Sequence, residues 1–223
     1  MAGLEQTTAS ASPAGARVAV NGAGRPGRPG YDLDSLLGVA VQVFNERGYD
    51  GTSMGDLAKR LGISKSAIYH HVESKETLLE LALERAHRGL FAVAEEVQAL
   101  QAPAVAKLER LVHDSVMVLV EELPYVTLLL RVRGNTAVER RALSRRRTLD
   151  RQVAALLQEA IADGDIRSDI DAKLAARLLF GLVNSLVEWY RPRSRDAGRV
   201  IADTVTRVAF EGIRSPPQVG AVA

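Results

Sequence analysis

Cysteine is missing from all 223 residues of the chain. This absence excludes a disulfide framework and any zinc site with thiolate ligands, and it agrees with a protein of the reducing cytosol. A long hydrophobic run is missing too, because the densest stretch, residues 116–120, is far shorter than the roughly 20 residues of a membrane-spanning helix. The N-terminus has no continuous apolar core of a signal peptide. We therefore expect a soluble, cytoplasmic protein that does not bind membranes.

The sequence also has no large excess of charge of either sign. Its 29 Lys and Arg residues are balanced by 27 Asp and Glu residues, which leaves a formal net charge of +2. Any affinity for nucleic acid must therefore come from a local group of basic residues and not from the molecule as a whole. With 47% hydrophobic and 25% charged residues, the composition is otherwise that of an ordinary globular protein with a sizeable core.

Alternating strands with hairpin turns are not found in the sequence either, whereas apolar residues recur at helical spacing along most of it. Glycine and proline separate the periodic segments. The predicted helices span residues 33–47, 54–61, 65–71, 75–98, 104–122, 125–133, 137–163, 171–190 and 197–213. The sequence thus predicts an all-α fold of about nine helices.

Two of the predicted helices are short and are joined by a tight turn at Gly62, Ile63 and Ser64. Ser53 and Asp56 have the spacing of a capping box that starts the first helix, and Ser64 is a favourable N-cap for the second. This arrangement is typical of a helix-turn-helix, whose second helix enters the major groove of DNA. The N-termini of both helices can direct backbone N–H groups at phosphates. The segment is therefore a candidate DNA-binding element.

The residues of this segment resemble the DNA-binding domain of TetR-family transcriptional repressors. The resemblance extends without gaps over roughly residues 33–85 and is carried by the stretches 44–54, 57–64, 67–72 and 74–76. It implies a homodimer that binds a palindromic operator as a repressor and releases it when a small hydrophobic ligand enters the C-terminal domain. Such a protein is not an enzyme and needs no cofactor.

The resemblance also divides the chain and assigns roles to its residues. It implies a three-helix helix-turn-helix DNA-binding domain at residues 31–76 and a helical ligand-binding and dimerisation domain at 77–214, before a flexible tail at 215–223. Phosphate contacts fall on Thr52, Tyr69, His71 and Lys75, and base contacts fall on Lys65, Ser66, Ala67 and His70. Ser53 and Ser64 are helix caps and also candidate DNA ligands. The helix dipole disfavours Lys75 at the start of its helix, and a bound phosphate would remove that penalty.

Residues 1–30 are rich in small residues and proline, which predicts a disordered basic arm. Within this arm, residues 25–29 resemble the core of an AT-hook. In such a motif Arg25 and Arg28 would enter a narrow, A·T-rich minor groove. A basic linker with only non-specific affinity for DNA remains the alternative.

The C-terminal half is predicted to bind the effector and a second subunit. Apolar stripes with small residues such as Gly181 and Ala209 make the helices near 171–190 and 197–213 the candidate dimer interface. Residues 189–192 are similar to a segment of regulators of acyl-CoA, fatty-acid or aromatic-acid catabolism. This similarity suggests an acyl-CoA effector held by arginines, and a planar, lipophilic effector is the alternative. The candidate pocket residues are Met117, Tyr125, Leu129, Arg133, Asn184, Glu188 and Trp189.

Three further patterns point to other classes of protein. Gly51-Thr52-Ser53-Met54-Gly55 matches the nucleophile elbow of serine hydrolases, but that motif requires a buried strand before it, and the preceding residues are polar. The glycines at 22–27 match a dinucleotide-binding fingerprint but follow no strand. His70 and His71 are adjacent and lack the spacing of two metal ligands on one helix face. We therefore expect no catalytic, cofactor or metal site.

Overall fold

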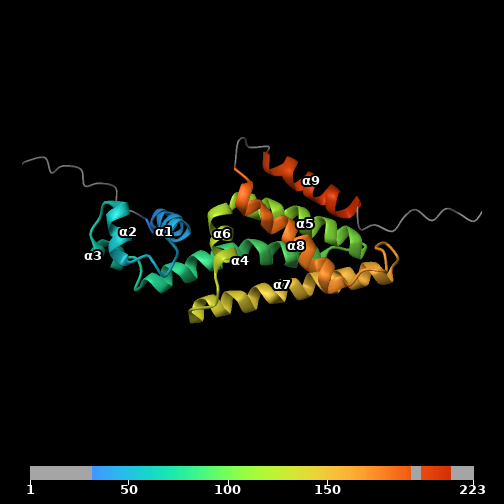
Figure 1. Cartoon of the computed structure of the whole chain (residues 1–223), viewed down its shortest axis with the longest axis horizontal. Helices are drawn as coiled ribbons and strands as arrows, with labels where there is room; N and C mark the ends of the chain where they lie inside the picture. Colours follow the sequence, from blue (N-terminus) through green and yellow to red (C-terminus); the bar gives the residue numbers. More distant parts are fainter. Residues whose placement is uncertain (1–31, 192–196, 212–223) are drawn as a thin grey trace, which may run out of the picture. The chain divides into compact units, whose positions relative to one another are not determined.

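The computed structural model describes residues 32–191 and 197–211 (Figure 1). Within these ranges the chain is all-α, as predicted, and contains no strand. The helices are α1 (Leu33–Arg47), α2 (Met54–Leu61), α3 (Lys65–Tyr69), α4 (Lys75–Ala99), α5 (Ala104–Glu121), α6 (Leu123–Arg131), α7 (Ala137–Ala162), α8 (Ala172–Trp189) and α9 (Ala197–Glu211). The predicted arm at 1–30, with Arg25 and Arg28, and the tail at 215–223 lie outside the described residues.

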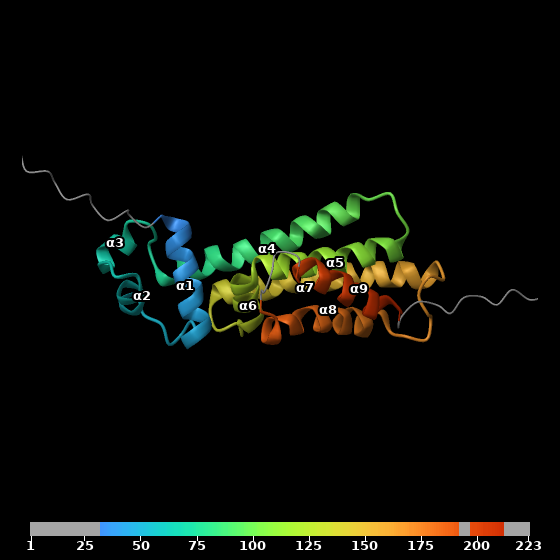
Figure 2. The same ribbon diagram turned by 90° about the horizontal axis from the view of Figure 1, so that it is seen from above.

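Helix α1 is defined at both ends by local signals and is held in place by its apolar face. The carboxylate of Asp32 accepts a hydrogen bond from the backbone N of Ser35 at 2.7 Å, which is the usual role of an N-cap. Gly48, at φ 81°, ends the helix in a conformation that L side chains rarely adopt. Helix α1 packs against α2, α4 and α6, as Figure 2 shows for α4. Its buried residues are Leu36, Leu37, Ala40, Val41, Val43 and Phe44.

Helices α4–α9 build the larger part of the core, with α5 in contact with α4, α6, α7, α8 and α9. Two glycines let α5 approach its neighbours closely. A Cβ atom at Gly89 of α4 would lie 2.8 Å from Cγ1 of Val118, and one at Gly198 of α9 would lie 2.9 Å from Cγ1 of Val120. Any larger residue at either glycine would force the helices apart.

The helix boundaries differ from the predictions at a few ends. Helix α3 ends at Tyr69, with His70 as its C-cap, two residues earlier than expected. Helix α6 begins at Leu123 and places Pro124 in its first turn, where proline removes no hydrogen bond. The predicted start at residue 125 was therefore too late. The described residues fall in one compact unit, and the division at 76–77 remains a prediction.

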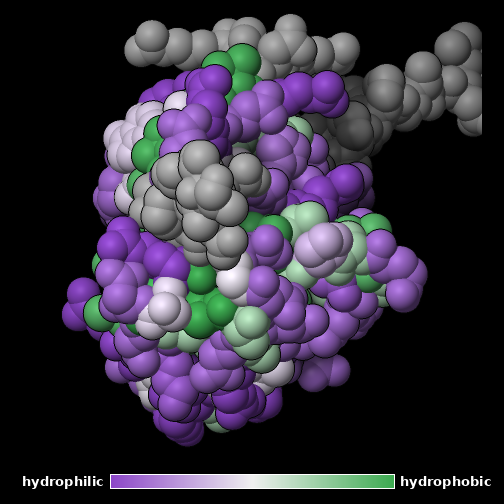
Figure 3. Space-filling view, turned by 90° about the vertical axis from the view of Figure 1, so that its right-hand side faces the viewer, coloured by the Kyte–Doolittle hydropathy of each residue, from purple (hydrophilic) through white to green (hydrophobic). Residues whose placement is uncertain are grey.

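None of the helices in the described ranges is both long and apolar enough to cross a membrane. The face shown in Figure 3 is mainly hydrophilic, and apolar side chains reach it only in small patches.

Candidate nucleic-acid interface and ligand pocket

The turn between α2 and α3 is built from short-range hydrogen bonds. The hydroxyl of Ser53 accepts from the backbone N of Asp56 at 3.2 Å, and the Asp56 carboxylate accepts from the backbone N of Ser53 at 2.9 Å. This is the predicted capping box. Hydrogen bonds from Ser53 hold the pKa of the Asp56 carboxyl below its usual range. Gly62, at φ 68°, ends α2 and turns the chain into α3.

Helix α3 presents its polar side chains to solvent from an apolar base. Ile68 is fully buried and Val72 is nearly so, while the hydroxyl of Ser64 caps the helix by accepting from the backbone N of Ala67 at 3.1 Å. Tyr69 is 52% exposed. The exposed side chains on and beside α3 are Ser64, Lys65, Ser66, Tyr69, His70 and His71. The structure thus brings together on one short helix most of the side chains predicted to contact DNA.

Thr52 and Lys75 make hydrogen bonds within the protein. Thr52 is buried, and its hydroxyl donates to the carbonyl of Gly48 at 2.8 Å. The ammonium of Lys75 donates to the carbonyls of Tyr49 at 2.8 Å and Thr52 at 2.7 Å, and it lies 4.2 Å from the centroid of the Tyr49 ring. Lys75 therefore needs no phosphate to be stabilised at the start of α4. Both side chains fix the loop before α2 against α4.

The stretch Gly51–Gly55, which matches a nucleophile elbow in sequence, does not have the geometry of one. Ser53, its central serine, is the N-cap of α2, and its hydroxyl lies 2.5 Å from the Asp56 carboxylate. No strand precedes it in the described part of the chain, so the sharp strand-to-helix turn of that motif is not formed. The described residues also contain no group of three or more His, Asp or Glu residues that could hold a metal ion.

A small internal cavity lies between α4, α5, α6, α7 and α8, with a volume of about 30 Å³. That volume is close to the space one water molecule occupies. Two of the proposed pocket residues, Leu129 and Asn184, line this cavity together with Ser115. His87 of α4, which the sequence did not single out, lines it too; it is 1% exposed, and its Nε2 has no hydrogen-bond partner within the described residues. A larger ligand can enter only if the surrounding side chains move.

The other predicted pocket residues do not line this cavity. Tyr125 is buried under the guanidinium of Arg85, which lies 4.4 Å from its ring centroid. Met117 is half-buried on α5, and Glu188 and Trp189 are exposed at the end of α8.

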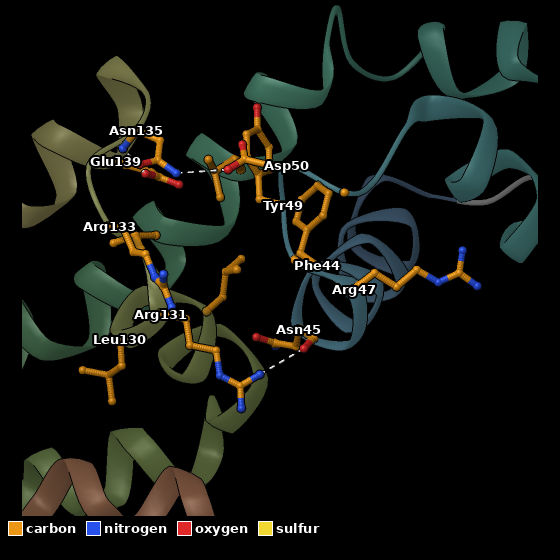
Figure 4. Close-up of a pocket in the computed structure, with 15 residues that line it drawn as sticks. Phe44, Asn45, Arg47, Tyr49, Asp50, Leu130, Arg131, Arg133, Asn135 and Glu139 are labelled. Carbon is orange, nitrogen blue, oxygen red and sulfur yellow. Dashed lines mark hydrogen bonds between the residues drawn. The ribbon is translucent and has the colours of Figure 1, made fainter.

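Arg133 lines a separate hollow of about 700 Å³ between the loop after α1 and the connection from α6 to α7. Figure 4 shows this hollow and two of the hydrogen bonds that cross it. One guanidinium N of Arg131 donates to the carbonyl of Asn45 at 3.0 Å, and the Asn135 amide donates to the carboxylate of Asp50 at 3.0 Å.

Helix α6 is thereby tied to both α1 and α4. The side-chain amide of Asn45 in α1 donates to the carbonyl of Pro124 at 2.8 Å. Arg85 of α4 makes a two-pronged ion pair with Glu122, with N···O distances of 2.8 and 3.0 Å. Such paired contacts have a fixed geometry. These contacts link α6 to α1, which packs against α2, and to α4, which follows α3.

Comparison with known proteins agrees with this architecture. The family profile described as "Bacterial regulatory proteins, tetR family" matches residues 36–82, and the one described as "Tetracyclin repressor-like, C-terminal domain" matches residues 101–213. The HTH-type transcriptional repressor KstR2 of Rhodococcus jostii is 33% identical over 197 residues, which cover 81% of this chain and 90% of that protein. The chain belongs to the TetR family of transcriptional regulators.

Solved structures of TetR-family proteins have the same fold. The crystal structure of SCO3833, a TetR-family member from Streptomyces coelicolor, is 56% identical and superimposes with a TM-score of 0.77, covering 81% of this chain and 91% of that one. The structure of AibR is 24% identical with a TM-score of 0.67, covering 79% of this chain and 97% of that one. The predicted TetR-family membership is confirmed, and with it the all-α class.

The buried His87 makes the stability of this TetR-family protein depend on pH. Burial lowers the pKa of His87 from its ordinary 6.5 to about 4, and the charge of Arg145 acts in the same direction. At a pH between these two pKa values, His87 binds a proton in the unfolded chain but not in the folded one. The free energy of unfolding therefore falls as the pH falls from 6.5 to about 4. The contribution of this residue to the free energy of unfolding should decrease by about 3 kcal/mol from pH 7 to pH 4.

Urea unfolding of the wild type and of His87→Gln, each near neutral pH and at about pH 4.5, measures this contribution. The titration of the carboxylates is common to both proteins, so the difference between their pH dependences isolates His87. We expect the wild type to lose about 2 kcal/mol more than the variant over this range. Equal losses would show that His87 is not kept neutral in the fold.

Proposed function

We propose that this protein is a dimeric repressor that binds a palindromic operator through α2 and α3 and releases it when a small hydrophobic effector, of the acyl-CoA class, binds the helices behind them. The observation that carries the proposal is the set of exposed donors on α3 above the buried Ile68. In a helix-turn-helix this surface faces the major groove, where side chains reach base edges and phosphates. Lys65, Ser66 and His70 are the proposed base-reading residues, and Ala67 offers a methyl contact.

Tyr69, His71 and the N-terminus of α3 at Ser64 are in reach of phosphates in this arrangement. Thr52 and Lys75 support DNA binding indirectly, because their hydrogen bonds fix the loop that precedes α2. Ser53 has the same supporting role through the capping box. This assignment revises the expectation of direct phosphate contacts from the side chains of Thr52 and Lys75.

Dimerisation is supported by an unpartnered apolar row on α8. Leu174, Leu178 and Leu182 follow one another at a spacing of four residues, and they are 55%, 65% and 38% exposed. Val200 and Val208 of α9 are 61% and 60% exposed. Large apolar side chains in such a row are typical of a surface that a partner covers. A second copy would form a four-helix interface across a two-fold axis, which matches the symmetry of a palindromic operator.

Release of DNA follows if the effector prefers a conformation in which the two α3 helices no longer fit the operator. An effector that enlarges the cavity displaces helices that line it, and α6 is one of these. Because α6 is hydrogen-bonded to α1 through Asn45 and ion-paired to α4 through Arg85, that displacement reaches the helices that position α3. Helix α4 itself runs from the cavity to the loop after α3.

The acyl-CoA class is supported by two observations. The AibR structure was determined in complex with isovaleryl coenzyme A and operator DNA, so the same fold can bind both ligands. The residues behind α3 surround an apolar cavity with a few polar groups, which is the usual composition of a small-molecule site. A planar, lipophilic effector is the second candidate, and the cavity alone suits it equally well.

Mapping the genomic DNA fragments that the purified protein retains, with and without acyl-CoA thioesters, tests the proposal. We expect enrichment of fragments that share one palindromic sequence and loss of that enrichment when an effector is present. If the retained DNA fragments shared no sequence, the role as a specific repressor would be contradicted.

The arm ahead of α1 leads to a separate prediction on DNA binding. Deletion of residues 1–28 should weaken operator binding, because Arg25 and Arg28 can no longer enter the minor groove. The magnitude of the slope of log affinity against log salt concentration should fall by about 4, since the dimer loses two arms with two DNA-contacting arginines each. Fluorescence anisotropy with labelled operator at several salt concentrations measures both quantities.

The variant Arg25→Gln/Arg28→Gln in the full-length chain is the matched control for the deletion. If Arg25 and Arg28 bind in the minor groove, this variant should lose as much affinity as the deletion does for operators with A·T-rich flanking sequences. An unchanged affinity and salt slope for the deletion would show that the arm takes no part in operator binding.

A further inference from the structure

A basic groove of about 420 Å³ follows the contact between α7 and α8. Its floor contains the small side chains Ala154, Ala155 and Ala176. Four cationic side chains and a single acidic one line it, namely Arg147, Arg151, Lys173, Arg177 and Asp150. On each helix the two cations are four residues apart, so they follow one another at about 6 Å along the axis. The groove therefore carries two cations from each of the two helices.

The cations of this groove form no ion pairs with acidic side chains of the described residues. Arg141 and Arg145, also on α7, form ion pairs with Glu80 and Glu84 of α4. In contrast, Arg147, Lys173 and Arg177 have neither an ion pair nor a hydrogen bond within the described residues. The guanidinium of Arg151 donates only to the hydroxyl of Thr148, at 3.0 Å. Unpaired guanidinium groups around a groove are suited to phosphate, which they bind in two-pronged fashion.

The groove adjoins the internal cavity behind α3. Asp150 lines both, and on α8 the groove residue Arg177 is followed one turn later by Phe180 and two turns later by Asn184, which line the cavity. His87 also lines the cavity, and its buried Nε2 has no hydrogen-bond partner within the described residues. In the neutral ring this nitrogen can pair with a polar group of a ligand.

We propose that the effector is an acyl thioester of coenzyme A that lies along the contact between α7 and α8. Its phosphates bind Arg147, Lys173 and Arg177 in the groove, and its acyl end enters the cavity towards His87. A ligand in this position is polyanionic at one end and apolar at the other, as the two sites require. A free fatty acid has a single charge and would leave most of the groove cations unpaired. The inference rests on the proposed function and assigns the binding site of its effector.

The test uses the full-length protein bound to operator DNA and a panel of straight-chain, branched and ring-containing acyl-CoA thioesters, with free coenzyme A and the matching free acids. Arg147→Gln/Arg177→Gln removes two groove cations. Arg88→Gln/Lys107→Gln is the matched control, because these cations have no ion pair in the described residues and do not line the groove. Fluorescence anisotropy gives the concentration of each thioester that releases half of the DNA.

We expect at least one thioester to release the wild-type protein at lower concentration than its free acid. The groove variant should need about 100-fold more of it, or about tenfold for each lost guanidinium–phosphate contact. Its affinity for DNA without effector and its thermal midpoint should equal those of the wild type. The control variant should respond as the wild type does.

Equal thioester concentrations for the groove variant and the wild type would overturn the proposed site. Release by free acids or neutral lipophilic compounds, but by no thioester, would overturn the acyl-CoA class and leave the repressor intact. A wild-type protein that retains no specific DNA would instead refute the proposed function itself. These outcomes distinguish a wrong binding site from a wrong class of effector and from a wrong proposed function.

Discussion

Leu178→Glu is expected to convert the protein from a dimer to a monomer and to lower its affinity for operator DNA by about a thousandfold. Leu178 is 65% exposed and lies in the middle of the apolar row of α8. In a two-fold interface the same residue of each subunit lies near the axis, so two carboxylates would be buried close together. Like charges in that position cost several kcal/mol, and about 4 kcal/mol corresponds to a thousandfold change.

Sedimentation equilibrium gives the oligomeric state of this variant, and anisotropy with labelled operator gives its affinity for DNA. Leu100→Glu is the matched control, because Leu100 is also exposed, at 41%, but follows α4 and lies outside α8 and α9. The control should remain a dimer with unchanged affinity. A dimeric Leu178→Glu protein would show that the exposed row of α8 is not the dimer interface.

Lys65→Ala/Tyr69→Ala is expected to lower operator affinity by about 100-fold without loss of the fold. Both side chains are exposed on α3, whereas the packing of this helix depends on Ile68, which stays in place. A good contact to a base or a phosphate contributes about 1–3 kcal/mol, so the loss of two contacts gives a change of this order.

Anisotropy with the operator and with an unrelated DNA of equal length measures the effect of this change and its specificity. Lys107→Ala, on α5 and remote from α3 in the sequence, is the control for the loss of one positive charge. The thermal midpoint of all proteins should be the same. An operator affinity equal to that of the wild type would contradict the assignment of α3 as the reading helix.

The helices around the DNA-binding surface could be predicted because their ends are determined by neighbouring residues. Ser53, Ser64 and Ser74 are N-caps in the structure, and Gly48 and Gly62 end their helices at positive φ. These signals act over three or four residues and do not depend on tertiary structure. The same locality explains why the position of α3 and its exposed donors followed from the sequence.

The residues around the cavity could not be predicted in the same way, because helical spacing does not say which neighbour a side chain faces. Tyr125 has the right period but is covered by Arg85 of another helix. His87 is a single histidine among apolar residues of α4, and only its neighbours on α5–α8 reveal that it lines a cavity. The two carbonyls that bind Lys75 lie 26 and 23 residues earlier in the chain, so no local signal could reveal them.

The missing cysteines allow a direct test of where α3 lies on DNA. Glu73→Cys places one thiol just after α3 in an otherwise cysteine-free chain, and an iron chelate attached to it cleaves the DNA nearby. If α3 of each subunit enters the major groove, cleavage should occur at two clusters one helical turn apart, about 34–36 Å, or a multiple of that distance. The same chelate on Glu95→Cys, near the other end of α4, should give no such clusters. Diffuse cleavage from position 73, or equal patterns from both positions, would contradict the claim that α3 reads the operator.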